Sequence, residues 1–213
     1  MSLFILDLLY TMNEKIQRLY QILDKSVSDC NSTCISLSGG LDSSILASLM
    51  KSKEKNAISI ICKEFPGTDL TYSQMVAKKF QLPLVMKLIS TEEVIAAIEK
   101  TIKILKVFND IEIRNSVVMY LSLQTVKKNG FSSVITGDGA DELFAGSNFW
   151  LRMNKDEVQN DLKRIRKIMH FSTKEIGKKL GIKVESPFLT EKVIDFAQSL
   201  SLNYNTNIQK GEK

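Results

Sequence analysis

Short apolar runs typical of strands alternate with longer helical patterns over residues 33–136. The strand-like runs lie at Thr33–Leu37, Ala57–Cys62, Leu84–Leu88 and Ser133–Thr136. The helical patterns between and after them lie at Ser43–Lys53, Asp69–Phe80, Thr91–Leu105 and Arg114–Asn129. Such alternation favours a parallel sheet with helices on both faces. We therefore predict an α/β fold, with a parallel sheet sandwiched by helices.

The strand signal stops after Gly146. Helical patterns follow around Asp156–Met169, Thr173–Leu180 and Thr190–Leu200. A chain of 213 residues with only three prolines suits one well-buried domain. We predict a single domain over 1–213, made of an N-terminal helix in 1–28, an α/β core over 30–147 and an appended C-terminal helical segment over 148–213.

The N-terminal helix is expected to be amphipathic. Its apolar positions face either the core or a partner, and the core is the favoured interpretation: Leu8, Ile16, Leu19, Ile22 and Leu23. A homo-oligomer that forms through this helix is the alternative. The apolar run at Leu3–Tyr10 is interrupted by Asp7, is too short to span a bilayer and lacks the flanks of a signal peptide. We expect no membrane segment.

The cysteine and histidine content argues against a zinc site. Cys30, Cys34 and Cys62 are three in number and cannot all pair internally, and His170 is the only histidine. Reduced thiols in a cytoplasmic protein are the favoured interpretation. His170 lies between Met169 and Phe171, and we interpret it as a structural residue.

The net charge of +5 is concentrated in one segment. Residues 151–183 carry ten basic side chains and four acidic ones. A solvated helix face is the favoured interpretation, and a surface for a polyanion is the alternative. Nucleic-acid binding is disfavoured, because no RNA-binding module is recognisable.

Residues 37–44, LSGGLDSS, follow the first strand and lead into a helix. Gly39 and Gly40 permit a tight turn that leaves backbone N–H groups uncovered. With the hydroxyls of the neighbouring serines and the helix dipole, these groups can hold an anion. Asp42 suits such a site if a divalent cation lies between it and a phosphate. The alternative is a structural turn with a capping serine. The loop is not a Walker A sequence, since no Gly-Lys-Ser/Thr follows.

Residues 136–146, TGDGADELFAG, repeat this arrangement after a later strand. Asp138, Asp141 and Glu142 lie within five residues and would repel one another without a cation or a basic partner. Carboxylates at a strand edge suit Mg²⁺ held beside the phosphates of a nucleotide. The two motifs in this order are stronger evidence for a nucleotide site than either motif alone.

These stretches resemble a known family. LSGGLDSS resembles the pyrophosphate-binding loop of the ATP pyrophosphatase superfamily, and TGDGADELFAG resembles the SGEGADE segment of asparagine synthetases and β-lactam synthetases. Residues 113–121 (IRNSVVMYL) and 186–189 (SPFL) are similar to two further segments of that family. The similarity extends over about residues 30–200. It implies an adenine nucleotide α-hydrolase-like fold, with 30–147 as the nucleotide-binding core.

The resemblance also implies roles for individual residues. The residues that would contact ATP are Leu37, Ser38, Gly39, Gly40, Asp42, Ser43, Ser44, Lys63, Arg114, Thr136 and Gly137. Asp42 and Asp141 would bind Mg²⁺. Asp138 would serve the amide-forming step, where the family has a glutamate that is one methylene longer. Around Ser186 the family commonly reads Arg-Val-Pro-Phe-Leu-Asp, where this chain has ESPFLT.

The resemblance implies an ATP-dependent amide-forming ligase with ATP and Mg²⁺ as cofactors. A carboxylate, with aspartate favoured, would become an acyl-adenylate with release of pyrophosphate, and ammonia would then displace AMP. We expect no glutaminase domain, because Ser2 replaces the N-terminal cysteine nucleophile of such domains. Ammonia would be free or come from a separate glutaminase subunit. The alternatives are a non-catalytic or partner-dependent nucleotide-binding subunit and a tRNA-modifying enzyme with the same ATP loop.

Overall fold

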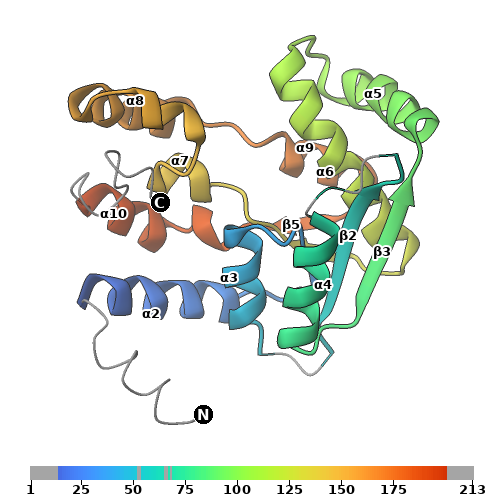
Figure 1. The fold of residues 1–213 in the computed structure, drawn as a ribbon, viewed down its shortest axis with the longest axis horizontal. Coiled ribbons are helices and arrows are strands. Elements are labelled where there is room, and N and C mark those ends of the chain that lie inside the picture. The colour runs from blue at the N-terminus through green and yellow to red at the C-terminus, as the bar shows by residue number, and fades with distance from the viewer. Residues whose placement is uncertain (1–13, 52–53, 65–66, 68, 201–213) are drawn as a thin grey trace.

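Five parallel strands form one sheet in the computed structural model, which describes residues 14–51, 54–64, 67 and 69–200 (Figure 1). The strand order is β3-β2-β1-β4-β5. The bounds of the strands are β1 Cys34–Ser36, β2 Asn56–Cys62, β3 Leu84–Ile89, β4 Ser133–Ile135 and β5 Lys183–Glu185. The predicted parallel α/β sheet is confirmed.

Helices connect the strands and continue after them. Their bounds are α2 Glu14–Ser28, α3 Leu41–Leu49, α4 Asp69–Lys79, α5 Thr91–Leu105, α6 Asp110–Lys128, α7 Ala140–Phe144, α8 Lys155–Ile168, α9 Ser172–Leu180 and α10 Glu191–Ser199. Two 3₁₀ turns are η1 Asn148–Arg152 and η2 Pro187–Leu189. Among the described residues, none of the helices has the length and apolar character needed to cross a membrane.

The sheet is covered on both faces. Side chains of α2, α3, α4 and α10 share one apolar cluster with β1, and side chains of α5, α6 and α9 share another with β2 and β4. This explains the nearly continuous apolar sequence of β2, because strands covered on both faces do not alternate between apolar and polar residues. Ala57, Ile58 and Ile61 are all buried there.

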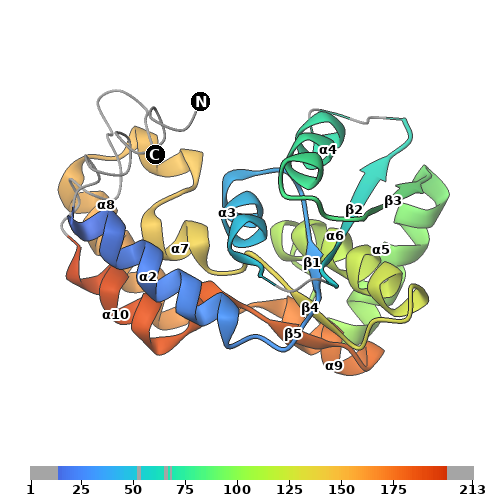
Figure 2. The ribbon, with the colours of Figure 1, turned by 90° about the horizontal axis from the view of Figure 1, so that it is seen from below.

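Helix α2 lies beside α10 and α3 and joins the first cluster (Figure 2). Leu23 is buried, and Leu19 and Ile22 pack against the same cluster. The prediction that these positions face the core is confirmed. Ile16 is 54% exposed, and Leu8 lies outside the described residues.

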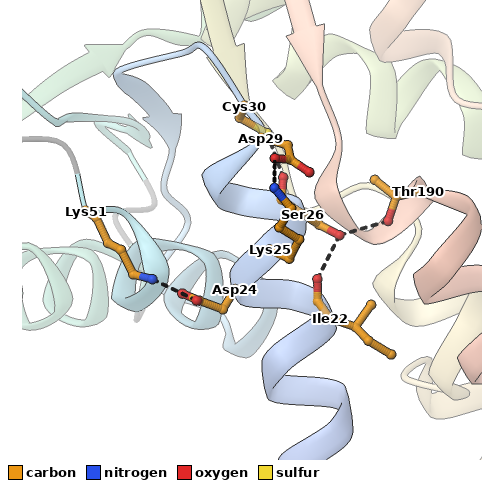
Figure 3. A network of polar contacts seen from close by, with 8 residues as sticks. All are labelled: Ile22, Asp24, Lys25, Ser26, Asp29, Cys30, Lys51 and Thr190. Atoms are coloured by element: carbon orange, nitrogen blue, oxygen red, sulfur yellow. Dashed lines mark hydrogen bonds and ion pairs between the residues drawn. The ribbon is translucent and has the colours of Figure 1, made fainter.

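Polar contacts also hold α2 in place (Figure 3). The Ser26 hydroxyl donates to the carbonyl of Ile22 at 2.9 Å, and its oxygen lies 3.0 Å from the Thr190 hydroxyl just before α10. Lys51, after α3, forms an ion pair with Asp24 at 2.7 Å. Because Thr190 and Lys51 belong to different parts of the chain, α2 ties the two together.

The prediction that strands end at Gly146 is wrong. β5 adds a fifth strand beside β4, with Val134 opposite Val184. The strand is only three residues long, and it follows a helix end at Gly181. The segment after residue 148 is therefore not purely helical, because β5 joins the sheet and α9 packs against it.

The close contact between α9 and β5 depends on Gly177. A Cβ at this position would lie 2.7 Å from both the carbonyl oxygen of Ile182 and Cγ2 of Val184. Neither atom belongs to the end of a long flexible side chain, so a side chain at 177 would push the helix away from the strand.

We expect Gly177→Ala to destabilise the protein by about 1–3 kcal/mol, the usual cost of overpacking. The better helix propensity of alanine offsets about 1 kcal/mol at most. Urea unfolding measures the change, with Lys178→Ala, an exposed neighbour on α9, as the control. A Gly177→Ala midpoint equal to that of the parent would contradict the tight α9–β5 contact.

Candidate functional site

The two glycine-rich loops meet at one edge of the sheet. β1 and β4 are neighbours and run parallel, with Ile35 opposite Ile135. The loops that follow them line one cleft of about 900 Å³. A Cβ at Gly137 in the second loop would lie 3.4 Å from Cβ of Asp42 in the first. The site therefore combines residues separated by about a hundred positions in the sequence.

The first loop is shaped by Gly39 and Gly40. Gly39 has a φ of +82°, and a Cβ there would lie 2.5 Å from the backbone nitrogen of Ser73 in α4. Only glycine suits both conditions. Gly40 precedes α3 and provides no side-chain cap. Since the first N–H groups of a helix lack partners within the helix, this end of α3 can accept an anion.

The serines of this loop have different roles. The hydroxyls of Ser38 and Ser43 lie 3.1 Å apart, and both residues line the cleft. Ser44 donates to the Gly40 carbonyl at 2.7 Å and is not part of the cleft wall. Ser38 and Ser43 are therefore the serines best placed to donate to a phosphate.

The second loop holds Asp138 in a half-buried position. The Thr136 hydroxyl donates to Oδ2 of Asp138 at 3.0 Å, and the Thr173 hydroxyl of α9 donates to Oδ1 at 3.4 Å. The Ser186 hydroxyl lies 3.1 Å from that of Thr136. Since the Thr136 proton is directed to Asp138, Ser186 is the donor in this second contact. Both oxygens of Asp138 are thus held in a fixed orientation.

Burial raises the pKa of Asp138, although the Thr136 and Thr173 hydroxyls and the charge of Lys174 act to lower it. Burial also raises the pKa of Glu142, and the negative charges of Asp141, Asp138 and Asp42 raise it further. The neighbouring carboxylates therefore oppose the ionisation of Glu142. A bound cation would relieve that repulsion.

Gly146 leaves space for Asp141. A Cβ on Gly146 would overlap Oδ1 of Asp141. Asp141 and Asp42 both line the cleft, one from each loop. Within the described ranges, no group of three or more His, Cys, Asp or Glu side chains could hold a metal ion. A Mg²⁺ ion bound by these two carboxylates would take its other ligands from phosphate oxygens or water, which is its usual coordination.

The opposite wall of the cleft was not predicted from the sequence. It comes from the start of α6 and from the α8–α9 region, where the hydroxyls of Ser116 and Ser172 lie 2.6 Å apart. Arg164 and His170 contribute to this wall. His170 is exposed, and its interpretation as a structural residue stays a prediction.

Some of the predicted nucleotide contacts lie away from the cleft. Leu37 is 1% exposed, and its N–H donates to the carbonyl of Ile58. Lys63, at the end of β2, and Arg114, on α6, are both exposed. None of these three residues lines the cleft. The predicted residues that do line it are Ser38, Gly40, Asp42, Ser43, Thr136, Gly137, Asp138 and Asp141.

Comparison with known sequences identifies the family. The profile described as asparagine synthase matches residues 17–180, which is most of the chain and includes both loops. This chain belongs to the asparagine synthase family. The match accounts for the two loops in their observed order, and it ends at the last residue of α9.

Individual members of the asparagine synthase family are distantly similar. The chain is 27% identical over 188 residues to a putative glutamine-hydrolysing asparagine synthetase of Methanocaldococcus jannaschii, covering 84% of this chain and 35% of that protein. It is 28% identical over 183 residues to asparagine synthetase 1 of Lotus japonicus, covering 79% of this chain and 31% of the relative. The chain therefore spans about a third of the length of these relatives.

Among solved structures, the U34-tRNA thiolase NcsA from Methanococcus maripaludis overlaps with this chain at a TM-score of 0.47 and 15% identity, over 89% of this chain and 65% of that one.

At pH 7, without Mg²⁺ or nucleotide, we expect Glu142→Gln to raise the melting temperature by about 1–3 °C. A gain of somewhat less than about 1 kcal/mol in the free energy of unfolding produces such a shift in a chain of this size. The raised pKa means that ionised Glu142 destabilises the folded state above that pKa. The gain should therefore disappear as the pH falls below the ordinary carboxyl range. Glu175→Gln on the exposed face of α9 is the matched control for calorimetry. An equal gain in both variants would contradict the carboxylate cluster.

We expect Gly146→Ala to weaken Mg²⁺-dependent stabilisation by ATP about tenfold in apparent Mg²⁺ affinity, the lower end of the loss for a disturbed metal site. The added methyl group would displace the Asp141 carboxylate. Thermal-shift titration with Mg²⁺ at a fixed ATP concentration measures the apparent Mg²⁺ affinity. In a double-mutant cycle, Gly146→Ala should add nothing to Asp141→Asn. Additive losses would mean that glycine acts independently of Asp141.

Proposed function

We propose that this asparagine synthase family member is an ATP-dependent carbon–nitrogen ligase. It would activate a carboxylate, with aspartate as the first candidate, as an acyl-adenylate and then pass the acyl group to ammonia. The observation that carries the proposal is the meeting of two glycine-rich loops, after β1 and β4, in one cleft, with the start of α3 in the first loop and three carboxylates in the second. A simple nucleotide-binding turn would not need the second, carboxylate-rich loop.

The residues of the cleft suit MgATP. The uncapped end of α3 and the hydroxyls of Ser38 and Ser43 offer donors to the leaving pyrophosphate. Asp42 and Asp141 would hold Mg²⁺. When bound there, Mg²⁺ would neutralise charge on the phosphate oxygens. Thr136 and Gly137 border the same space and would contact the adenylate.

The chemistry would take two steps. A carboxylate oxygen of the substrate forms a bond to the α-phosphorus, and the bond from that phosphorus to pyrophosphate breaks. The nitrogen of ammonia then attacks the acyl carbon, AMP leaves, and one proton must be removed from the nitrogen. Asp138 would accept that proton, because a raised carboxyl pKa brings a base closer to the working pH. Thr136 and Thr173 would keep its carboxylate in position.

Two further parts of the proposal concern the source of ammonia and the location of the protein. Ammonia would be free or delivered by a separate glutaminase subunit. A cytoplasmic location would suit the three free thiols of the chain.

A nucleotide-binding subunit without turnover is the second candidate function. It is favoured by the burial of Asp138 and by the hydrogen bonds that engage both of its oxygens.

The proposal is tested by pyrophosphate release and amide formation with MgATP, ammonium and a panel of amino acids. We expect Asp138→Asn to lower amide formation by about 100-fold or more, the usual contribution of a general base, while MgATP still raises the melting temperature. Asp42→Asn should instead weaken the Mg²⁺ dependence of that thermal shift. The two variants therefore separate the second chemical step from nucleotide binding.

The outcomes distinguish the candidates. MgATP binding without pyrophosphate release under any condition would favour the subunit without turnover. Full amide synthesis by Asp138→Asn would show that Asp138 is structural. Asp138→Glu, which restores the side chain of the family, should raise amide yield more than pyrophosphate release if the shorter acid limits the second step. A bulkier native substrate would instead make the same change lower both.

A further inference from the structure

Strand β3 ends the sheet with a regular, unpaired backbone edge. Ala57 in β2 donates to the carbonyl of Pro83 at 2.8 Å, and Lys63 donates to the carbonyl of Ile89 at 2.9 Å. The backbone groups of a strand alternate between its two sides. Val85 and Lys87 therefore bond to β2 as well, and the N–H and C=O groups of Leu84, Met86 and Leu88 point to the free side. Within the described residues, the sheet ends here.

The apolar side chains along this edge are partly or largely exposed. Met86 is 40% exposed and Leu88 is 48% exposed. Met75, on the neighbouring helix α4, is 60% exposed and lies one residue from Gln74, whose amide nitrogen is 3.6 Å from Sδ of Met86. Figure 1 shows β3 at the rim of the sheet, next to α4. We call Leu84, Met86 and Leu88 the edge row.

Lysines often protect exposed sheet edges from pairing, but the lysine of β3 is engaged elsewhere. Lys87 forms an ion pair with Glu93 of α5 at 2.7 Å. Its side chain also points to the opposite face from Leu84, Met86 and Leu88, because successive strand residues alternate between faces. β3 contains neither proline nor glycine to interrupt pairing. Neither of these protections is present at this edge.

We propose that two copies of this chain pair through β3 in an antiparallel arrangement, with the twofold axis at Met86. This register places Met86 opposite Met86 of the second copy and Leu84 opposite Leu88 of the second copy. These are the residues whose backbone groups are free, so each pair can exchange both of its hydrogen bonds. One continuous sheet would then run through both copies.

The pattern specifies a second copy rather than an unrelated strand. A twofold interface requires a self-complementary surface, since each residue meets its symmetry partner. The edge row satisfies this, because its apolar residues are symmetric about Met86. The same register places Lys87 opposite Val85 of the second copy, so the two lysines do not face each other. Like charges directly opposite would destabilise the pair.

The first test is the mass in solution, measured by light scattering after gel filtration at about 100 μM, since association depends on protomer concentration. We expect twice the 24.0 kDa of one chain. Met86→Lys should return the mass to one chain that is still folded, as far-UV circular dichroism would show, because Met86 is exposed. Ile95→Lys, the same change on the exposed face of α5, should leave the dimer intact.

The second test is the register. The Cα atoms of a hydrogen-bonded antiparallel pair lie about 5.5 Å apart, within the range of a disulfide. Met86→Cys should therefore form a disulfide-linked dimer on mild oxidation, above the background of the parent's own cysteines. Leu88→Cys should not, since its two copies would lie about 14 Å apart along the strands.

Each other outcome would overturn the proposal. A mass of one chain for the parent rules out the second copy as the occupant of the edge, and binding of an added strand peptide to that monomer would indicate a foreign partner. A dimer that survives Met86→Lys but is lost in Ile16→Lys uses α2 instead. A dimer in which Leu88→Cys crosslinks and Met86→Cys does not has a different register. The interface is independent of the proposed ligase activity, which should be the same per chain in both states.

Discussion

The parallel pairing of β1 with β4 is the constraint on which the candidate site depends. The chain builds β2 and β3 on one side of β1 and then crosses to place β4 and β5 on the other. At such a reversal of strand order, the loops that follow the two central strands diverge and leave a crevice. The crevice contains LSGGLDSS on one side and TGDGADELFAG on the other. A change in strand order would separate Asp42 from Asp141 even if both loops kept their shapes.

This arrangement has an energetic cost. Asp42, Asp138, Asp141 and Glu142 lie near one another, and burial together with mutual repulsion raises the pKa of Glu142. A fold optimised for stability alone would not gather these charges. The apolar clusters on both faces of the sheet offset the cost, and a bound cation would remove part of it. The candidate site is therefore a place where stability and ligand binding are coupled.

Much of the fold was predictable because its signals are local. The helix over Thr91–Leu105 was predicted with its observed bounds, and Ser90 and Glu93 form a capping box at its start. The helix predicted from Arg114 begins at Asp110 instead, because Asn109 caps it by accepting from the N–H of Glu112. β5 was missed because its three residues carry one apolar side chain. Its position depends on pairing with β4, about fifty residues earlier.

The difference between local signals and contacts between distant parts of the chain also applies to the site. It explains why β5 matters for the chemistry. The loop residues were predictable, since their glycines and acids form continuous motifs. Their supports were not. Thr173 reaches Asp138 from α9, and α9 lies against β5 through the space left by Gly177.

Ser186 reaches Thr136 from the residue after β5, and the Thr136 N–H donates to the carbonyl of Glu185 within that strand. The strand with the weakest sequence signal thus holds the hydroxyls that orient the candidate base. A family glutamate one methylene longer would bring its carboxylate to a different point. The hydroxyls of Thr136 and Thr173 fit the shorter aspartate, so the acid and its supports form one unit. Asp138→Glu would therefore change the length of the acid and these two hydrogen bonds together.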